Sequence, residues 1–271
     1  MKRTPFDTFK FILRKVLLTV LAAAVLFPLF YMFSSSLFSS GDFNNVSILP
    51  SKAVWENYAR VFGHRYFFTY IFNSVGTSVL AAIIRTAVVV LAAFALTHLR
   101  FCGRKAVLMA LVLTLFVPQE AVLYQNYRTT AALGLLDTWA GIICTSLFSA
   151  AQMLLMMGAF HAVGTESYDS ARIDGASDMR YITSVLVPLT TPVVMTVALQ
   201  TLITVFNNYL WPLLVTDRPR SRTIQIGITM LGFAESGRTG AQMAALVLIS
   251  APFLLILAFS KKGIERALVR R

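Results

Sequence analysis

The sequence is poor in charged residues, which make up 13% of its 271 positions, about half of the share found in soluble globular proteins. Hydrophobic residues make up 57%, so water is a poor solvent for most of the chain. A helix that crosses a membrane needs roughly 20 mostly apolar residues. The length therefore suits about six spanning helices with short loops, and it leaves no room for a separate catalytic domain.

The sequence also lacks the residue patterns of common catalytic and metal sites. Its two cysteines, Cys102 and Cys144, have no metal-type spacing around them. His64, His98 and His161 are far apart and belong to no His-Glu-x-x-His or Gly-x-Ser-x-Gly pattern. No Gly-x-x-x-x-Gly-Lys-Ser/Thr phosphate loop is present, so we expect no ATP hydrolysis by this chain. We predict that the protein has no catalytic residues, is not an enzyme, and binds no cofactor or metal itself.

Long apolar runs separated by polar segments predict an all-α integral membrane protein with six transmembrane helices. The first run follows a basic segment and is too long for the apolar core of a signal peptide, so we interpret it as a retained span. We predict that segments 39–63 and 217–240 are outer loops and that 163–181 is a cytoplasmic loop. The predicted spans are residues 16–36, 67–99, 106–123, 139–160, 182–206 and 241–259.

Acidic residues are scarce, with 12 Asp and Glu against 24 Lys and Arg. A net charge of +12 could attract nucleic acid, but the distribution of the charge indicates membrane topology instead. Fifteen basic residues fall in the predicted inner segments and eight in the outer ones. The positive-inside rule therefore favours both termini in the cytoplasm, although Arg218, Arg220 and Arg222 cluster on the side predicted to be outer.

The predicted cytoplasmic loop 163–181 contains most of the polar chemistry of the chain. Helix-forming residues lead to Asp174-Gly175, a turn signal because glycine tolerates positive φ, and a second short helical stretch follows. Two short helices joined by a tight turn form a compact projection from the membrane. From the spacing alone, this projection is either a solvated connector or a docking element for another protein.

This loop resembles the EAA loop of ABC importer permeases, whose core is Glu-Ala-Ala, three residues and then Gly. The matching residues here are Asp169-Ser170-Ala171-Arg172-Ile173-Asp174-Gly175-Ala176, with Val185-Leu186-Val187-Pro188-Leu189 downstream. Asp169-Ser170 stands where the family usually has Glu-Ala, a change that keeps an acid and a small side chain. The resemblance implies an ATPase-coupling loop that includes Glu166, Asp169, Ser170, Ala171, Asp174, Gly175 and Ala176.

The resemblance to inner-membrane permeases of the maltose/sn-glycerol-3-phosphate type covers nearly the whole chain. It includes Val117-Pro118-Gln119-Glu120, Leu133-Gly134-Leu135-Leu136-Asp137-Thr138 and Phe206-Asn207-Asn208-Tyr209-Leu210-Trp211-Pro212. It implies a single ABC transporter transmembrane domain over residues 1–271, in the bacterial cytoplasmic (inner) membrane. The implied partners are a second homologous permease in a heterodimer, two ATP-binding subunits that use ATP and Mg, an extracytoplasmic solute-binding protein and the lipid bilayer, without nucleic acid.

Arg85 is an ionisable residue inside a predicted span, where charge is costly and usually faces a bundle interior or a water-filled path. One interpretation is an ion pair that locks helices together, for example with Glu120 at the outer end of the third span. The other is a fixed positive charge beside the pathway, which would suit an anionic solute such as glycerol phosphate. The sequence leaves both interpretations open.

Polar and aromatic residues near the span ends offer further candidate solute contacts. Amide groups hydrogen-bond to hydroxyl groups, and aromatic faces pack on the C–H groups of a sugar ring. The same residues could instead anchor helices at the membrane interface. The candidate solute pathway comprises Arg85, Gln119, Glu120, Tyr124, Asn207, Asn208, Tyr209 and Trp211.

The function implied by the resemblance is that of a permease subunit in a binding-protein-dependent ABC importer, forming half of the pathway for a carbohydrate, either a mono- or an oligosaccharide. The same architecture importing sn-glycerol-3-phosphate or a glycerophosphodiester is the alternative that Arg85 keeps open. A gradient-driven secondary transporter is an alternative of another class, but it would need intramembrane acids or internal repeats. Glu120 is the one acid near a span interior and no repeat is visible, which favours the importer.

Overall fold

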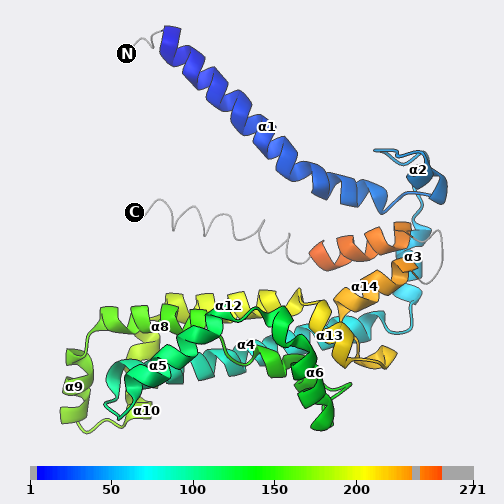
Figure 1. The fold of residues 1–271 in the computed structure, drawn as a ribbon. Helices are drawn as coiled ribbons and strands as arrows, with labels where there is room; N and C mark the ends of the chain where they lie inside the picture. The colour runs from blue at the N-terminus through cyan, green and yellow to red at the C-terminus, as the bar shows by residue number, and fades with distance from the viewer. Residues whose placement is uncertain (1–4, 234–238, 252–271) are drawn as a thin grey trace. The chain divides into compact units, whose positions relative to one another are not determined.

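The computed structural model describes residues 5–233 and 239–251, and every regular element in these ranges is helical. This confirms the all-α prediction for the described part of the chain. The residues divide into two compact units. Unit 1 comprises the described residues up to Phe67 and from Gly227 onward, and unit 2 comprises Phe68–Ile226. Figure 1 labels their helices.

Unit 1 begins with a long helix that carries the first predicted span. Its labelled helices are α1 (Pro5–Ser35), α2 (Ser40–Asn44) and α3 (Glu56–Gly63). No side chain in the most apolar stretch of α1 is buried against the described parts of the chain, as suits a helix that meets lipid or other subunits. Asn57 of α3 holds the turn after α1, because its Nδ2 donates to the carbonyls of Ser36 at 2.9 Å and Phe38 at 3.0 Å.

A capping box at Asp42 orders the short helix α2. Asp42 Oδ2 accepts from the backbone N–H of Ser39 at 2.9 Å, and Oδ1 accepts from the N–H of Ser51 at 3.1 Å. These hydrogen bonds, with the contribution of Ser51 the largest, lower the pKa of Asp42 to about 2. The carboxylate is therefore charged at neutral pH and ties together the two ends of the turn.

Unit 2 is organised around α4 (Phe67–His98), a continuous 32-residue helix that matches the predicted span 67–99. The elements after it are α5 (Arg104–Leu113), η1 (Thr114–Phe116), η2 (Gln119–Val122), α6 (Leu123–Ala132), α7 (Trp139–Ile143), η3 (Cys144–Ser146), α8 (Ala150–Val163), α9 (Glu166–Ile173), α10 (Asp178–Tyr181), the π-helical η4 (Ile182–Leu186), α11 (Val187–Leu189), α12 (Thr191–Phe206), α13 (Leu210–Val215), η5 (Pro219–Ser221) and α14 (Ile224–Phe233), which continues into unit 1.

Three predicted spans are bent rather than straight. The bends measure 95° between Arg104–Phe116 and Gln119–Ala132, 58° between Trp139–Ser146 and Ala150–Val163, and 88° between Asp178–Leu189 and Thr191–Phe206. Pro118 and Pro192 lie at the first and third bends, where a missing backbone N–H interrupts the helical hydrogen bonds. Two helices, Phe11–Ser35 and Phe67–His98, are by themselves long and apolar enough to cross a membrane, or up to five if each bent pair is one span. The count of six stays a prediction.

Helices also occur where the sequence predicted loops. The predicted outer loops 39–63 and 217–240 contain α2, α3 and α14, and α6 continues the third predicted span to Ala132. Ile224, Ile226 and Ile228 are almost fully buried, so packing stabilises α14 although a basic, polar segment precedes it. The sixth predicted span overlaps the apolar helix Thr239–Ala251, and its positions 252–259 lie outside the described residues.

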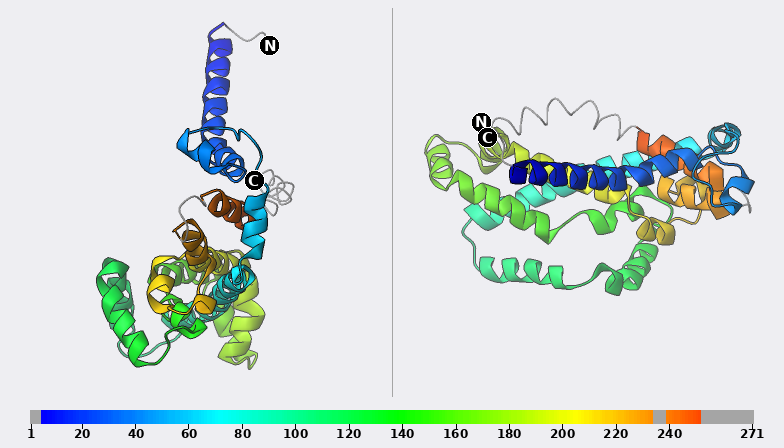
Figure 2. Two further views of the ribbon diagram at one scale, coloured as in Figure 1. Left: turned by 90° about the vertical axis from the view of Figure 1, so that its right-hand side faces the viewer. Right: turned by 90° about the horizontal axis from the view of Figure 1, so that it is seen from above.

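The main core of unit 2 lies where α4, α8 and the segment after α9 meet. Val89, Phe94, Met153 and Phe160 are among its fully or nearly fully buried side chains. In Figure 1 and in the right panel of Figure 2, α9 and α10 lie at one end of α4, and α13 lies at the other. The structure thus places the predicted coupling loop, which contains α9 and α10, and the helix α13 at opposite ends of α4 (Figure 1).

Candidate functional site

The predicted cytoplasmic loop folds into α9 and α10, joined by a turn; we call residues 166–181 the docking hairpin. Gly175 in the turn has φ of +79°, a conformation that glycine adopts readily. The N–H groups of Gly175 and Ala176 donate to the carbonyls of Arg172 at 3.1 Å and Ala171 at 2.9 Å. This pair of hydrogen bonds is the Schellman ending of a helix, and it confirms the turn predicted at Asp174-Gly175.

One face of the docking hairpin is open to solvent. Among the predicted coupling residues, Glu166, Asp169, Ser170, Asp174 and Gly175 are exposed, whereas Ala171 and Ala176 are half-buried. Ile173 at the tip is 86% exposed, and the predicted coupling set did not include it. The signal that could have identified Ile173 is its place inside the Ala-Arg-Ile-Asp-Gly sequence, where an apolar residue stands among polar ones.

Contacts inside the hairpin join α9 to α10. The hydroxyl of Tyr168 donates to Asp178 Oδ1 at 2.8 Å, and Arg172 forms an exposed ion pair with the same oxygen at 3.3 Å. Burial, with a smaller effect from Asp178, raises the pKa of Tyr168, so its hydroxyl keeps its proton and remains a donor. These contacts hold α9 and α10 together from inside the hairpin.

The charged residue in the second span has a backbone partner. Arg85 is 8% exposed, and its Nε donates to the carbonyl of Ser146. Ser146 ends η3 just before the 58° bend, where a helix end leaves carbonyls without intrahelical partners. An ion pair with Glu120, one of the two interpretations left open for Arg85, is absent from the ion pairs of the described residues, and Glu120 lies on an exposed segment beyond the 95° bend.

The other candidate solute contacts differ in exposure. Gln119, Glu120, Tyr124, Asn207 and Tyr209 are exposed, and Asn208 is half-buried. Trp211 is buried and its Nε1 donates to the carbonyl of Gly141 at 3.0 Å, so its polar atom is used inside the subunit. Within the described structure, no hydrogen bond or ion pair joins Arg85, Gln119 or Glu120 to the segment 207–211.

Helix α12 carries an exposed polar stripe that was not recognised in the sequence. Thr196, Gln200, Thr204 and Asn207 are all exposed, and their spacing of four, four and three residues places them on one helix face. The amides of Gln152 and Gln200 hydrogen-bond at 3.2 Å, linking this stripe to α8. A polar residue once per turn within an apolar run is the sequence signal that could have revealed it.

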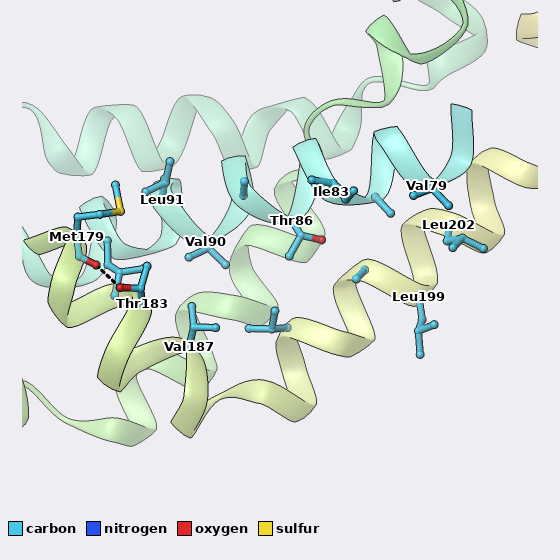
Figure 3. A pocket seen from close by; sticks show the side chains of 15 residues that line it. Val79, Ile83, Thr86, Val90, Leu91, Met179, Thr183, Val187, Leu199 and Leu202 are labelled. Carbon is cyan, nitrogen blue, oxygen red and sulfur yellow. Dashed lines mark hydrogen bonds between the residues drawn. The ribbon is translucent and has the colours of Figure 1, made fainter. Parts of the chain in front are cut away.

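Unit 2 also contains an apolar groove of about 700 Å³ between α4 and the segment from α10 to α12. Figure 3 shows side chains such as Val79, Ile83 and Leu202 along its two walls. Its polar side chains are Thr86 and Thr183, and the hydroxyl of Thr183 donates to the Met179 carbonyl at 2.9 Å. The groove therefore offers almost no hydrogen bonds to a hydroxylated solute.

Asp137 holds a loop at the end of unit 2 far from the docking hairpin. Its Oδ1 accepts from the backbone N–H groups of Asp217 and Arg218, each at 2.8 Å. Its own N–H donates to the Val215 carbonyl at 2.8 Å, and its φ is +61°. These contacts give a structural role to Asp137, the acid of the Leu-Gly-Leu-Leu-Asp-Thr sequence.

Asn73, near the start of α4, fastens the rest of the same loop. Its Nδ2 donates to the carbonyls of Arg220 at 2.9 Å and Arg222 at 3.0 Å, and its Oδ1 accepts from Trp139 Nε1 at 3.0 Å. The loop 217–222 is therefore fixed to α4 at its N-terminal end, while the docking hairpin contacts its C-terminal end through His98.

The family model described as "Binding-protein-dependent transport system inner membrane component" matches residues 66–270. The chain belongs to this family. The assignment confirms the resemblance to importer permeases. It identifies the protein as a membrane component of a binding-protein-dependent transporter and not as an enzyme.

Curated relatives match this permease over most of its length. It is 29% identical to the sn-glycerol-3-phosphate transport system permease protein UgpE of Agrobacterium fabrum, over 90% of this chain and 91% of the relative. It is 30% identical to UgpE of Rhizobium meliloti, over 78% and 79%. It is 26% identical to the trehalose transport system permease protein SugB of Mycobacterium tuberculosis, over 91% and 92%.

A solved structure shares the fold of this permease. It is a bacterial ABC transporter involved in the import of the acidic polysaccharide alginate, and one of its chains aligns with a TM-score of 0.84 and 23% identity. The alignment covers 97% of this chain and 99% of the other. The likeness supports the fold, and the family match carries the assignment.

Proposed function

We propose that this chain is a permease subunit of a bacterial ABC importer and forms half of the translocation pathway for a carbohydrate. The polar stripe of α12 supports this proposal, because exposed polar groups on an apolar helix generally face a water-filled path. Its amides and hydroxyls can hydrogen-bond to sugar hydroxyl groups. Gln119, Glu120, Tyr124, Asn208 and Tyr209 are further proposed contacts, whereas the contacts of Arg85 and Trp211 indicate structural roles.

The docking hairpin is the proposed attachment site of an ATPase subunit, and the exposed side chain of Ile173 is the observation that carries this proposal. An isoleucine that is 86% exposed at the tip of an ordered hairpin can enter an apolar pocket of a partner. The exposed acids Glu166, Asp169 and Asp174 of the same hairpin can supply charged rim contacts. The complete importer would contain two ATPase subunits that use ATP and Mg, a second permease in a heterodimer, and an extracytoplasmic solute-binding protein.

The proposed topology has six spans in one domain over residues 1–271, with both termini in the cytoplasm of the bacterial cell. Helix α4 supports one part of this topology, the placement of two loops on opposite sides, since Asn73 contacts the loop 217–222 and His98 contacts the docking hairpin. Twenty-five residues of α-helix are about 37 Å long, and the hydrocarbon core is about 30 Å thick. The two loops can therefore lie on opposite sides of the membrane.

Copurification from membranes in mild detergent tests the docking proposal. Full burial of an isoleucine contributes about 1.5–3 kcal/mol, so Ile173→Asp is expected to weaken ATPase binding by roughly tenfold to 100-fold. Leu133→Asp is the matched control, because Leu133 is 67% exposed on a segment proposed to lie on the outer side. If Ile173→Asp retains the ATPase subunit, docking at this tip is contradicted. If the control Leu133→Asp also loses the ATPase subunit, the loss is not specific to the hairpin.

Import of sn-glycerol-3-phosphate is the second candidate function, and the names of the UgpE relatives favour it. Arg85 does not support import of this anion, because its guanidinium group is buried and donates to the Ser146 carbonyl. Uptake of labelled trehalose and of labelled sn-glycerol-3-phosphate by cells with and without this chain separates the candidates. The carbohydrate proposal predicts that uptake of trehalose, or of another sugar in a panel, depends on this chain. If only uptake of sn-glycerol-3-phosphate depends on it, the carbohydrate proposal is wrong and the second candidate function takes its place.

A further inference from the structure

Five aromatic rings lie where the docking hairpin meets the helices of unit 2, and we call them the aromatic cluster. Phe94 and His98 belong to the C-terminal part of α4, Phe160 to α8, Tyr168 to α9 and Tyr181 to α10. The ring centroid of Tyr168 lies 5.1 Å from that of Tyr181, 5.3 Å from His98 and 5.7 Å from Phe94. His98 also contacts Phe160 at 6.4 Å. One continuous set of ring contacts therefore connects α9 with α4, α8 and α10.

Hydrogen bonds fix two of these rings within the hairpin. The hydroxyl of Tyr181 lies 2.7 Å from Ser167 Oγ, and that of Tyr168 donates to Asp178. Phe160 and Tyr181 are at most 1% exposed, so the inner side of the cluster is close-packed. Close-packed rings in edge-to-face contact resist sliding past one another.

His98 joins the cluster mainly through its ring faces. Its Nδ1 lies 2.7 Å from Thr97 Oγ1 on its own helix, and its Nε2 has no hydrogen-bond partner among the described atoms. Stacking on Phe94 at 5.1 Å and the contact with Tyr168 remain. A phenyl ring at this position could therefore replace the imidazole in its contact with α9.

Helix α9 has few other attachments to the core of unit 2. Tyr168 and Ala171 are its residues that pack against the buried cluster of α4 and α8. Ala171 contributes a methyl group, whereas Tyr168 contributes a ring in contact with three others. Besides the two-residue chain link to α8 and the hydrogen bond between Ser167 and Tyr181, Tyr168 thus gives α9 its ring contacts with α4.

We propose that the aromatic cluster transmits movement of the docking hairpin to α4 and α8, with Tyr168 and His98 as positioning residues for transport. This inference rests on the proposed docking of an ATPase subunit at the hairpin. Packed elements shift between discrete arrangements instead of deforming continuously. Closure of the ATPase can thus move α4 together with α9 and α8 while the rings connect them.

The test uses the complete importer, with its second permease, ATPase subunits and solute-binding protein, reconstituted in proteoliposomes. ATP hydrolysis is measured with and without the binding protein, purified with the solute that it carries. His98→Ala, a substitution on α4 outside the docking hairpin, is expected to retain the ATPase subunits and basal hydrolysis, while stimulation by the binding protein falls about tenfold, which corresponds to about 1.4 kcal/mol. His98→Phe keeps a ring in contact with Tyr168 and is expected to keep the stimulation.

Wild-type stimulation in His98→Ala would overturn the proposal and leave docking intact. Equal loss in His98→Phe would also overturn it, because the imidazole nitrogens would then carry the effect instead of the ring contact. Loss of the ATPase subunits from His98→Ala would mean that the ring supports the docking surface and transmits nothing. Failure of docking itself is read separately, from ATPase retention by Ile173→Asp. If His98→Ala does not fold, His98→Leu replaces it, because leucine fills the space without a ring, and loss of stimulation is again expected.

Discussion

Replacing Asp137 by alanine should weaken the attachment of the loop 217–222 to the rest of unit 2 by freeing its first residues, while Asn73 still holds the carbonyls of Arg220 and Arg222. The carboxylate accepts two backbone hydrogen bonds of 2.8 Å, from Asp217 and Arg218, and its side chain is 17% exposed. Hydrogen bonds to a charged group contribute about 1.5–3 kcal/mol each. Because water reaches the freed N–H groups, we expect a net loss of about 2 kcal/mol for the pair.

A loss of about 2 kcal/mol raises the population of the opened loop roughly 30-fold. Limited digestion with trypsin measures this population when opening is fast relative to cleavage, and Arg220 and Arg222 supply cleavage sites in the loop. Cleavage in Asp137→Ala should accelerate by up to about that factor, because Asn73 still holds the carbonyls of Arg220 and Arg222. Asp137→Asn keeps the accepting oxygen and tolerates φ of +61°, so it should accelerate cleavage only a few-fold.

Two controls separate the hydrogen bonds from other effects. Asp137→Gly removes the acceptor without the strain that alanine has at positive φ, and it should still accelerate cleavage strongly. Asp217→Ala removes a charge from the same loop but keeps the backbone N–H that Asp137 binds, and it should cleave at the wild-type rate. Equal rates in Asp137→Ala and Asp217→Ala would refute the assigned role of the carboxylate.

Three further outcomes are expected. Gly76→Ala should lower the free energy of unfolding of the purified protein by about 1–3 kcal/mol, because a Cβ there would collide with the Trp139 ring. Gly158→Ala is the control, since there is open space around Gly158, and it should be neutral or raise stability by up to about 1 kcal/mol. Equal effects of the two substitutions in thermal unfolding would contradict the packing argument. The pKa of Asp42 is lowered to about 2. Hydrogen-exchange protection of the turn that Asp42 caps should therefore be constant above about pH 4 and fall as the pH drops towards 2. Asp42→Asn should remove this pH dependence. Arg85→Gln should leave the preference between neutral and anionic solutes unchanged in uptake competition, and a selective loss of anionic solutes would make Arg85 a solute contact.

Local sequence signals predicted the features that depend on a few neighbouring residues. The run of apolar residues in 67–99 predicted α4 almost to the residue, since hydropathy summed over about 20 positions is what determines membrane insertion. Asp174-Gly175 predicted the turn between α9 and α10, because positive φ is a property of glycine itself. The matched motifs carried the resemblance to importer permeases, which the family match confirmed.

Other features depend on which distant residues meet, and the tertiary structure decided them. Arg85 pairs with a carbonyl 61 positions away instead of with Glu120, because the break in the fourth predicted span leaves that acceptor free and the bend in the third carries Glu120 elsewhere. Trp211 was a candidate solute contact because its aromatic ring could pack on a sugar, yet its indole is buried and donates to the carbonyl of Gly141. Exposure and partner choice are results of packing, which hydropathy does not encode.

The sequence by itself determined that this is a helical membrane protein with a turn in an acidic loop, because composition, apolar run length and turn chemistry are local properties. The matched motifs added the resemblance to importer permeases. Only the tertiary structure decided that Ile173 is exposed at the tip of the docking hairpin and that Tyr168 meets His98, 70 positions earlier in the chain. Contacts between α9 and α4 arise when separate helices pack, and each ring is placed by the core around it.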